Sequence, residues 1–95
     1  MRFHRRTYRV TLRTMLSLKE VVDRYASLAK RWGDPVALSA FGLTPEETTK
    51  LFTSLDEDYH ISRFVNFSQA EGPTYPISGN PATHIRIDEP IRSLL

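Results

Sequence analysis

The chain opens with a strict alternation of polar and apolar side chains over residues 7–13. A period of two places successive residues on opposite faces of a strand, so the segment predicts a half-buried β-strand. Its polar face carries Arg9 and Arg13, which either protect an exposed strand edge or contact a ligand, and the pattern supports both interpretations equally. The opposite, buried face consists of Tyr8, Val10 and Leu12.

A helix is predicted to begin directly after Ser17. Ser17 and Glu20 have the spacing of a capping box, in which the two side chains satisfy backbone N–H groups at a helix start. Lys30 and Arg31 stand where cations stabilise a helix C-terminus, and Gly33 suits the stop. The apolar residues recur every three or four positions and predict one buried stripe. This stripe consists of Leu18, Val21, Val22, Tyr25, Leu28 and Ala29.

A second, short helix is predicted over residues 36–41. Asp34 followed by Pro35 has the form of an N-cap with proline at the first helical position, where its missing N–H costs nothing. Gly42 then marks the end of this segment.

A third helix is predicted to begin at Thr44 and to run through Leu55. Thr44 and Glu47 form another capping box, and Pro45 again occupies the first turn. Because only a short glycine-containing turn at Gly42 separates the second and third helices, the two predict a helix-turn-helix arrangement.

The last third of the chain reads as strands and turns. Residues 59–68 and residues 84–88 both alternate with period two and predict two strands of a returning hairpin, or wing. Residues 69–82 between them hold three prolines and two glycines, which favour turns, although Tyr75 and Ile77 can pair locally. In the final strand Ile85 and Ile87 are expected to point inward.

The composition places these elements in one α+β domain over residues 1–95, with an N-terminal strand, three helices and a C-terminal β-hairpin wing. A hydrophobic content of 40% with 25% charged residues fits a packed core and excludes collagen-like or disordered chains. The absence of Cys excludes disulfides, thiolate metal sites and thiol nucleophiles and suits the reducing cytosol. No apolar run approaches the roughly 20 residues that span a bilayer. We therefore expect a cytoplasmic protein without a membrane partner.

The net charge of +2 conceals an uneven distribution along the chain. Residues 1–31 carry nine Lys and Arg against Glu20 and Asp23, a formal charge of +7, whereas residues 32–95 carry four against nine, a charge of −5. Such halves can attract each other within one chain, attract a second copy or attract separate partners. The cations nearest the N-terminus are Arg2, Arg5, Arg6, Arg9 and Arg13.

Residues 37–64, ALSAFGLTPEETTKLFTSLDEDYHISRF, resemble the core of winged helix-turn-helix domains. In that family a short helix ends at a turn glycine, an apolar residue and a cap-plus-proline start follow, and the next helix holds an apolar anchor and leads into the first wing strand. The matching positions here are Gly42, Leu43, Thr44, Pro45 and Leu51, with wing strands at residues 60–68 and 84–88. Two positions depart from the family pattern and indicate a different helix crossing. Leu38 stands where a small residue is common, and Thr48 stands where an apolar residue faces the core.

The resemblance implies that residues 44–57 form a recognition helix, which in this family enters the DNA major groove. Its charge opposes that role, because Lys50 stands alone among five carboxylates and DNA affinity depends on cations that neutralise phosphates. The wing tip over residues 69–82 has no Lys or Arg either. The carboxylates are Glu46, Glu47, Asp56, Glu57 and Asp58.

The helix therefore has two interpretations. Glu46 and Glu47 can serve only to stabilise the helix N-terminus. Alternatively, the helix faces a protein partner through Glu46, Glu47, Thr49 and Lys50, and this is the interpretation that we carry forward.

No motif in the sequence points to catalysis, and we expect neither an enzyme nor a bound cofactor or metal. The phosphate-binding glycine loops, the G-x-S-x-G elbow and the H-E-x-x-H spacing are all absent. His60 and His84 could approach each other if their strands pair, with Asp58 or Asp88 as a third metal ligand. A lone histidine in a strand is more often an ordinary surface residue, so this possibility carries little weight.

Two functions from different classes remain. The first is a regulatory module that binds a protein partner or forms a symmetric homodimer through its oppositely charged halves. The second is a DNA-binding transcription regulator whose N-terminal arginines contact phosphates. A further alternative is a fragment of a larger assembly, because the apolar tail Ile91, Leu94 and Leu95 can pack either on this domain or on a neighbouring subunit.

Overall fold

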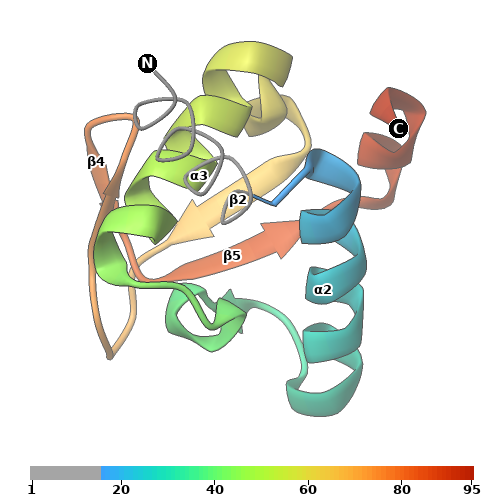
Figure 1. Ribbon diagram of the computed structural model, residues 1–95. Helices are drawn as coiled ribbons and strands as arrows, with labels where there is room; N and C mark the ends of the chain where they lie inside the picture. Colours follow the sequence, from blue (N-terminus) through green and yellow to red (C-terminus); the bar gives the residue numbers. More distant parts are fainter. Residues whose placement is uncertain (1–15) are drawn as a thin grey trace, which may run out of the picture.

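The computed structural model describes residues 16–95, which form a small α+β domain of helices and antiparallel strands (Figure 1). The strand predicted over residues 7–13 and the five N-terminal arginines lie outside the described residues. The elements, in chain order, are α2 (Leu18–Trp32), β1 (Val36–Ala37), the 3-10 helix η1 (Leu38–Phe41), α3 (Pro45–Tyr59), the 3-10 helix η2 (Ile61–Arg63), β2 (Val65–Ser68), β3 (Tyr75–Ile77), β4 (Asn80–Ala82), β5 (His84–Ile87) and the 3-10 helix η3 (Glu89–Leu94).

Both predicted capping boxes are confirmed. At the start of α2 the Glu20 backbone N–H donates to Ser17 Oγ at 3.1 Å, and the Ser17 N–H donates to Glu20 Oε1 at 2.8 Å. Thr44 and Glu47 exchange the same two bonds, at 3.1 and 2.9 Å, ahead of α3. Gly33 ends α2 as predicted, since its N–H donates to the Ala29 carbonyl at 2.7 Å.

The prediction of a helix over residues 36–41 is wrong for its first two residues. Val36 and Ala37 form strand β1 against β5, and only Leu38–Phe41 is helical, as a single 3-10 segment. Val36 is 2% exposed and pairs with Ile85, so burial of a β-branched side chain on the sheet outweighs the proline-based helix start. Ala37, not Asp34, is the N-cap residue.

The first wing strand begins later than predicted. Helix α3 extends to Tyr59, His60 takes a left-handed conformation with φ 53° and ψ 48°, and η2 follows, so that β2 starts only at Val65. Ile61 and Val65 are both buried. Their four-residue spacing satisfies a helical turn as well as a strand, which explains why alternation misled the prediction.

The two predicted hairpin strands, β2 and β5, pair with each other in antiparallel orientation. The main sheet has the order β1-β5-β2 with antiparallel neighbours, and Val65 lies opposite Ile87 while Phe67 lies opposite Ile85. Between them β3 and β4 form a second, two-stranded sheet in which Tyr75 lies opposite Ala82, which confirms the predicted local pairing. In Figure 1 this small hairpin stands along α3, and α2 lies on the other side of the molecule.

The core is centred on Phe52 of α3, which is fully buried. Its ring meets those of Phe41 and Phe67 edge-to-face, at centroid distances of 5.4 and 6.1 Å. Thr48 is also fully buried, and its hydroxyl donates to the Thr44 carbonyl at 2.9 Å, which explains how a polar residue is accommodated at this core position.

The C-terminal tail packs mainly on this domain. Ile91 is 1% exposed and Leu94 is partly buried against the core, whereas Leu95 is 49% exposed. Among residues 16–95 no helix has the length and apolar character needed to traverse a bilayer.

Candidate functional site

The four residues predicted to face a partner lie on α3 but do not act together. Glu47 is engaged in the capping box, and Thr49 is half-buried. Glu46 and Lys50 are exposed and pair with each other at 3.3 Å, one helical turn apart. Glu47 therefore serves the helix itself, and the pair Glu46–Lys50 presents little net charge to a partner.

The flank of α3 near its C-terminal end is covered by the β3–β4 hairpin. The Ser78 backbone N–H donates to Thr53 Oγ1 at 3.1 Å, and the Ser78 hydroxyl donates to Asp56 Oδ2 at 3.0 Å. Tyr75 and Ile77 of β3 are 6% and 3% exposed, so the hairpin contributes to the core. The β3–β4 hairpin therefore folds back onto α3.

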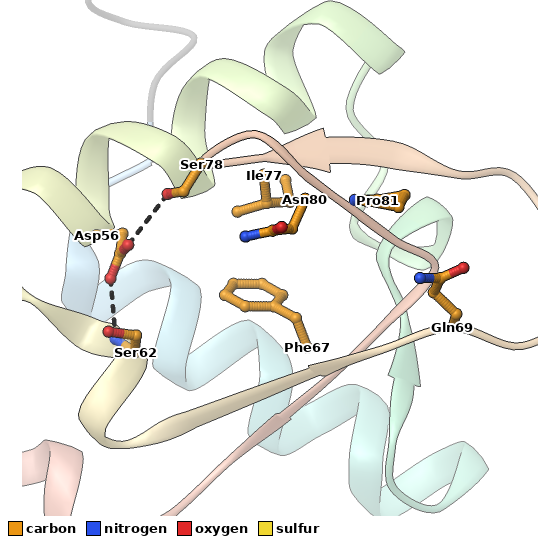
Figure 2. Close-up of a pocket in the computed structure, with 8 residues that line it drawn as sticks. All are labelled: Asp56, Ser62, Phe67, Gln69, Ile77, Ser78, Asn80 and Pro81. Carbon is orange, nitrogen blue, oxygen red and sulfur yellow. Dashed lines mark hydrogen bonds between the residues drawn. The ribbon is translucent and has the colours of Figure 1, made fainter.

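Asp56 joins three segments at this point. Besides Ser78, its carboxylate accepts the backbone N–H of Ser62 in η2, at 2.9 Å from Oδ1 (Figure 2). Both donors are neutral, and none of the ion pairs formed among residues 16–95 includes Asp56. These pairs are Lys19–Asp23, Lys50–Glu46, Arg86–Asp88 and Arg92–Glu89. The Asp56 carboxylate is thus held in place by hydrogen bonds, and no cation within the described part of the chain neutralises it.

A groove of about 480 Å³ lies between α3, β2 and the hairpin, beside this carboxylate (Figure 2). Phe67 rises into it from β2 and Ile77 faces it from β3, which gives an apolar floor. The side-chain amides of Gln69 and Asn80 border it, and each offers both a donor and an acceptor. The remaining lining residues are Asp56, Ser62, Ser78 and Pro81.

Among the strands formed by residues 16–95, none pairs with the edge of β2 next to the groove, which we call the open edge. In the order β1-β5-β2, strand β2 is terminal, so β5 occupies only one of its two edges. The carbonyls of Phe64 and Ser68 accept the N–H groups of Asp88 and Thr83, at 2.8 and 2.9 Å. Backbone groups alternate in direction along a strand, and those of Phe67 therefore point away from β5, toward the open edge.

Thr83 fixes the base of the hairpin against the main sheet. It is 3% exposed, its Oγ1 accepts the Ala70 N–H at 2.8 Å, and its backbone carbonyl accepts the Leu38 N–H at 2.9 Å. Because both Thr83 and His84 lie opposite Ser68, the ladder is interrupted by a bulge exactly where β4 becomes β5. This bulge turns the hairpin out of the plane of the main sheet.

A second surface lies at the C-terminal end of α2. Trp32 is 72% exposed there, and the Arg31 guanidinium lies 6.0 Å from its ring centroid. Trp32 borders a shallow hollow of about 320 Å³ together with Pro35, Ala37 and Ala40. An exposed Trp beside Arg is typical of protein interfaces.

The histidines are not brought together. His60 caps α3 outside the sheet, whereas His84 lies in β5 with its Nδ1 2.6 Å from Thr83 Oγ1. Over residues 16–95 no group of three His, Asp or Glu side chains has the arrangement of a metal site.

Among residues 16–95, the groups with displaced pKa values lie on α2 and not in the groove. The pKa of Glu20 falls below its ordinary value of 4.5, chiefly because its carboxylate accepts the Ser17 backbone N–H. The hydrogen bond from Lys19 lowers the pKa of Asp23, and burial raises the pKa of Tyr25. These shifts belong to helix capping, surface pairing and core packing, and they indicate no acid–base chemistry.

The five N-terminal arginines lie outside the described residues, and the remainder of the chain is acidic. Residues 16–95 carry eight Lys and Arg against eleven Asp and Glu, a formal net charge of −3. Sequence reasoning missed the groove, because its lining residues come from four separate segments and the bond that joins its two sides links Asp56 to Ser78 across twenty-two residues. Only the turn signal at Ser78-Gly79 indicated a defined hairpin tip. No protein-family model matches this chain, and neither a curated protein nor a solved structure matches it.

Proposed function

We propose that this chain is a non-catalytic regulatory module with a winged-helix-like arrangement, and that its partner is a protein. The order of elements supports the winged-helix arrangement. A short helix ends at Gly42 in a left-handed conformation, α3 begins at a capping box, and β2 and β5 form an antiparallel pair with a long connection. In this interpretation α3 corresponds to the recognition helix and the β3–β4 hairpin to the wing tip.

One observation carries the choice of a protein partner: the wing tip is bonded to the helix that would probe a duplex. The contacts of Ser78 with Thr53 and Asp56 occupy one flank of α3. Near its end Asp56, Glu57 and Asp58 add negative charge, which opposes the approach of phosphates. A helix covered and charged in this way is poorly suited to enter the major groove, whereas protein surfaces tolerate both features.

A DNA-binding transcription regulator remains the second candidate because of one specific feature. Five of the thirteen Lys and Arg residues stand within the first thirteen positions, and all five are Arg. Phosphate contacts made by this segment alone would need no recognition helix. The same segment could also attract the acidic remainder of a second copy, which would give a homodimer.

DNA titration separates these candidates. The full chain and a variant with Arg2, Arg5 and Arg6 replaced by Ala are titrated with a fluorescent duplex at about 50 mM and about 200 mM salt, a range over which phosphate-driven affinity falls by orders of magnitude. The proposal expects equally weak binding by both chains. Tight binding that is steeply salt-dependent and is lost in the variant would instead establish the DNA-binding alternative.

Sedimentation equilibrium of the same two chains tests the homodimer. A concentration-dependent dimer that weakens in the arginine variant would identify the second copy as a partner. A monomer at all concentrations would leave a separate protein as the partner that the proposal requires.

A further inference from the structure

We infer that the groove beside β2 binds an extended, basic segment of a partner polypeptide, which adds to the open edge of β2 as a further strand. This inference rests on the proposed protein-binding function and names its site and the chemistry of its partner. Three observations support it separately: the open edge of β2, an apolar groove floor bordered by two side-chain amides, and the Asp56 carboxylate, which forms no ion pair with any cation of residues 16–95.

The backbone N–H and C=O groups at the open edge of β2 can be paired by a polypeptide main chain. Val65 and Phe67 lie opposite Ile87 and Ile85 at positions whose own N–H and C=O groups point away from β5. No element formed by residues 16–95 pairs with this edge. An incoming strand satisfies such groups at regular spacing, which is the basis of recognition by strand addition.

The groove supplies what strand addition needs for specificity. Alternate side chains of an added strand point to one face, where Phe67 and Ile77 offer apolar contact. Gln69 and Asn80 stand at the border of the groove and can donate to and accept from the amide groups of the incoming chain. A volume of about 480 Å³ accommodates a few side chains and is small for a folded partner surface.

Charge selects a basic segment. The Asp56 carboxylate lines the groove, and its hydrogen bonds from Ser62 and Ser78 are to neutral donors, which orient it without cancelling its charge. A Lys or Arg side chain of the partner can reach a carboxylate that is already fixed, so little conformational entropy is lost on binding. The net charge of −3 over residues 16–95 favours the same choice.

A second copy seated on the same edge is the less favourable occupant. Symmetric pairing of two β2 edges would bring together two Asp56 carboxylates and two copies of residues 16–95, each with a net charge of −3. A separate basic segment avoids this repulsion.

The test uses the full chain, labelled with 15N, and a synthetic hexapeptide of alternating valine and lysine, blocked at both ends. Two control peptides accompany it: one with glutamate in place of lysine, and one with every second backbone amide N-methylated. We expect the lysine peptide to shift the amide resonances of β2 and of the β3–β4 hairpin, and both control peptides to bind at least about tenfold more weakly, because an added strand needs its main-chain donors.

Two matched pairs of variants test the individual contacts. Asp56→Asn removes the charge but keeps one oxygen to accept the Ser62 N–H, and its amide NH2 can donate to the Ser78 hydroxyl oxygen in place of the bond that Asp56 Oδ2 accepts. This variant should weaken binding of the lysine peptide about fivefold, the effect of one partly exposed ion pair. Asp58→Asn, which removes an exposed carboxylate elsewhere on α3, should leave affinity unchanged. Gln69 directly follows β2, and the alternation of Val65 and Phe67 continued by one step directs its backbone N–H toward the open edge. Gln69→Pro removes this N–H and should abolish binding, whereas Gln69→Ala removes only the side-chain amide and should weaken binding less. The amide spectrum of each variant reports whether it is folded.

Each other outcome would overturn the inference. Equal binding of the glutamate peptide would show that charge does not select the ligand, and equal binding of the N-methylated peptide would show that main-chain pairing does not contribute. Shifts confined to other surfaces would place the site elsewhere. Concentration-dependent shifts of β2 amides without peptide would make a second copy the occupant. The DNA titration decides the proposed function independently, so failure of the peptide to bind is distinguishable from failure of the protein-binding proposal.

Discussion

Replacement of Asp56 with alanine removes the acceptor that ties η2 and the β3–β4 hairpin to α3. Two hydrogen bonds are lost, from the Ser62 N–H at 2.9 Å and from the Ser78 hydroxyl at 3.0 Å. Bonds to a charged acceptor contribute about 1.5 kcal/mol each at the lower end of their range, which suits these partly exposed groups. Removal of a negative charge near a helix C-terminus stabilises the fold by about 0.5–1 kcal/mol, because such a charge interacts unfavourably with the helix dipole. The expected net loss of unfolding free energy is therefore about 2 kcal/mol.

Urea unfolding followed by far-UV circular dichroism measures this loss. The single Trp is a poor probe because Trp32 is largely exposed in the folded state. With an m-value of about 1 kcal/mol/M for so small a domain, the midpoint should fall by about 2 M urea. Hydrogen exchange adds a local readout, since the Ser62 amide loses its acceptor and should exchange faster, while the Ser78 amide keeps Thr53.

Asp58→Ala is the matched control, because Asp58 is exposed and near the same helix end. Its loss should change stability by less than about 0.5 kcal/mol. If Asp56→Ala and Asp58→Ala have the same midpoint and the same Ser62 exchange rate, the carboxylate does not hold the hairpin and η2 to α3, and the reasoning fails.

Three further changes test other parts of the fold. Gly42→Ala places a Cβ at φ 78° in the turn before α3 and should cost about 1–2 kcal/mol in urea unfolding, whereas no loss would mean that the turn relaxes freely. Thr83→Val leaves the Ala70 N–H without its acceptor and should lower the free energy of unfolding by about 1–3 kcal/mol. Thr74→Val, at an exposed position of the loop that contains Ala70, should leave it unchanged. The lowered pKa of Glu20 means that its ionised form stabilises the fold above pH 4.5 and that this contribution is lost as the pH falls through the lower folded-state value. Glu20→Gln should therefore flatten the decline in unfolding midpoint between about pH 5 and pH 3, and an unchanged slope would contradict the assignment.

The sequence was informative where structure is decided within a few residues. Ser17 with Glu20, and Thr44 with Glu47, form their capping boxes across three positions, and such bonds depend on little else in the fold. The residues that stop α2 and the short helix, Gly33 and Gly42, act equally locally. These elements were therefore predicted with correct starts or ends.

Prediction failed where a pattern fits two periods or where a distant partner decides. Ile61 and Val65 satisfy both a strand and a helical turn, and the deciding contact is the Ser62 N–H on the Asp56 carboxylate six residues earlier. Val36 lies in a strand and not in the predicted helix, because it pairs with Ile85, which is nearly fifty residues away in the sequence. The groove depends on Ser78 reaching Asp56 across twenty-two residues, and no local pattern in either segment encodes that contact.

The burial of the hairpin bears directly on which partner the scaffold can accept. To expose the covered flank of α3, the hairpin must withdraw Tyr75 and Ile77 from the core, and each fully buried side chain of this size contributes about 1.5–3 kcal/mol. A duplex that required this opening would need to offset several kcal/mol on a helix where Lys50 is the one cation and already pairs with Glu46. A strand added at the β2 edge requires no such opening, because the hairpin in its closed position forms one wall of the groove. The bonds of Ser78 to Thr53 and Asp56 thus cover one flank of α3 and also hold in place the hairpin that forms one wall of the groove.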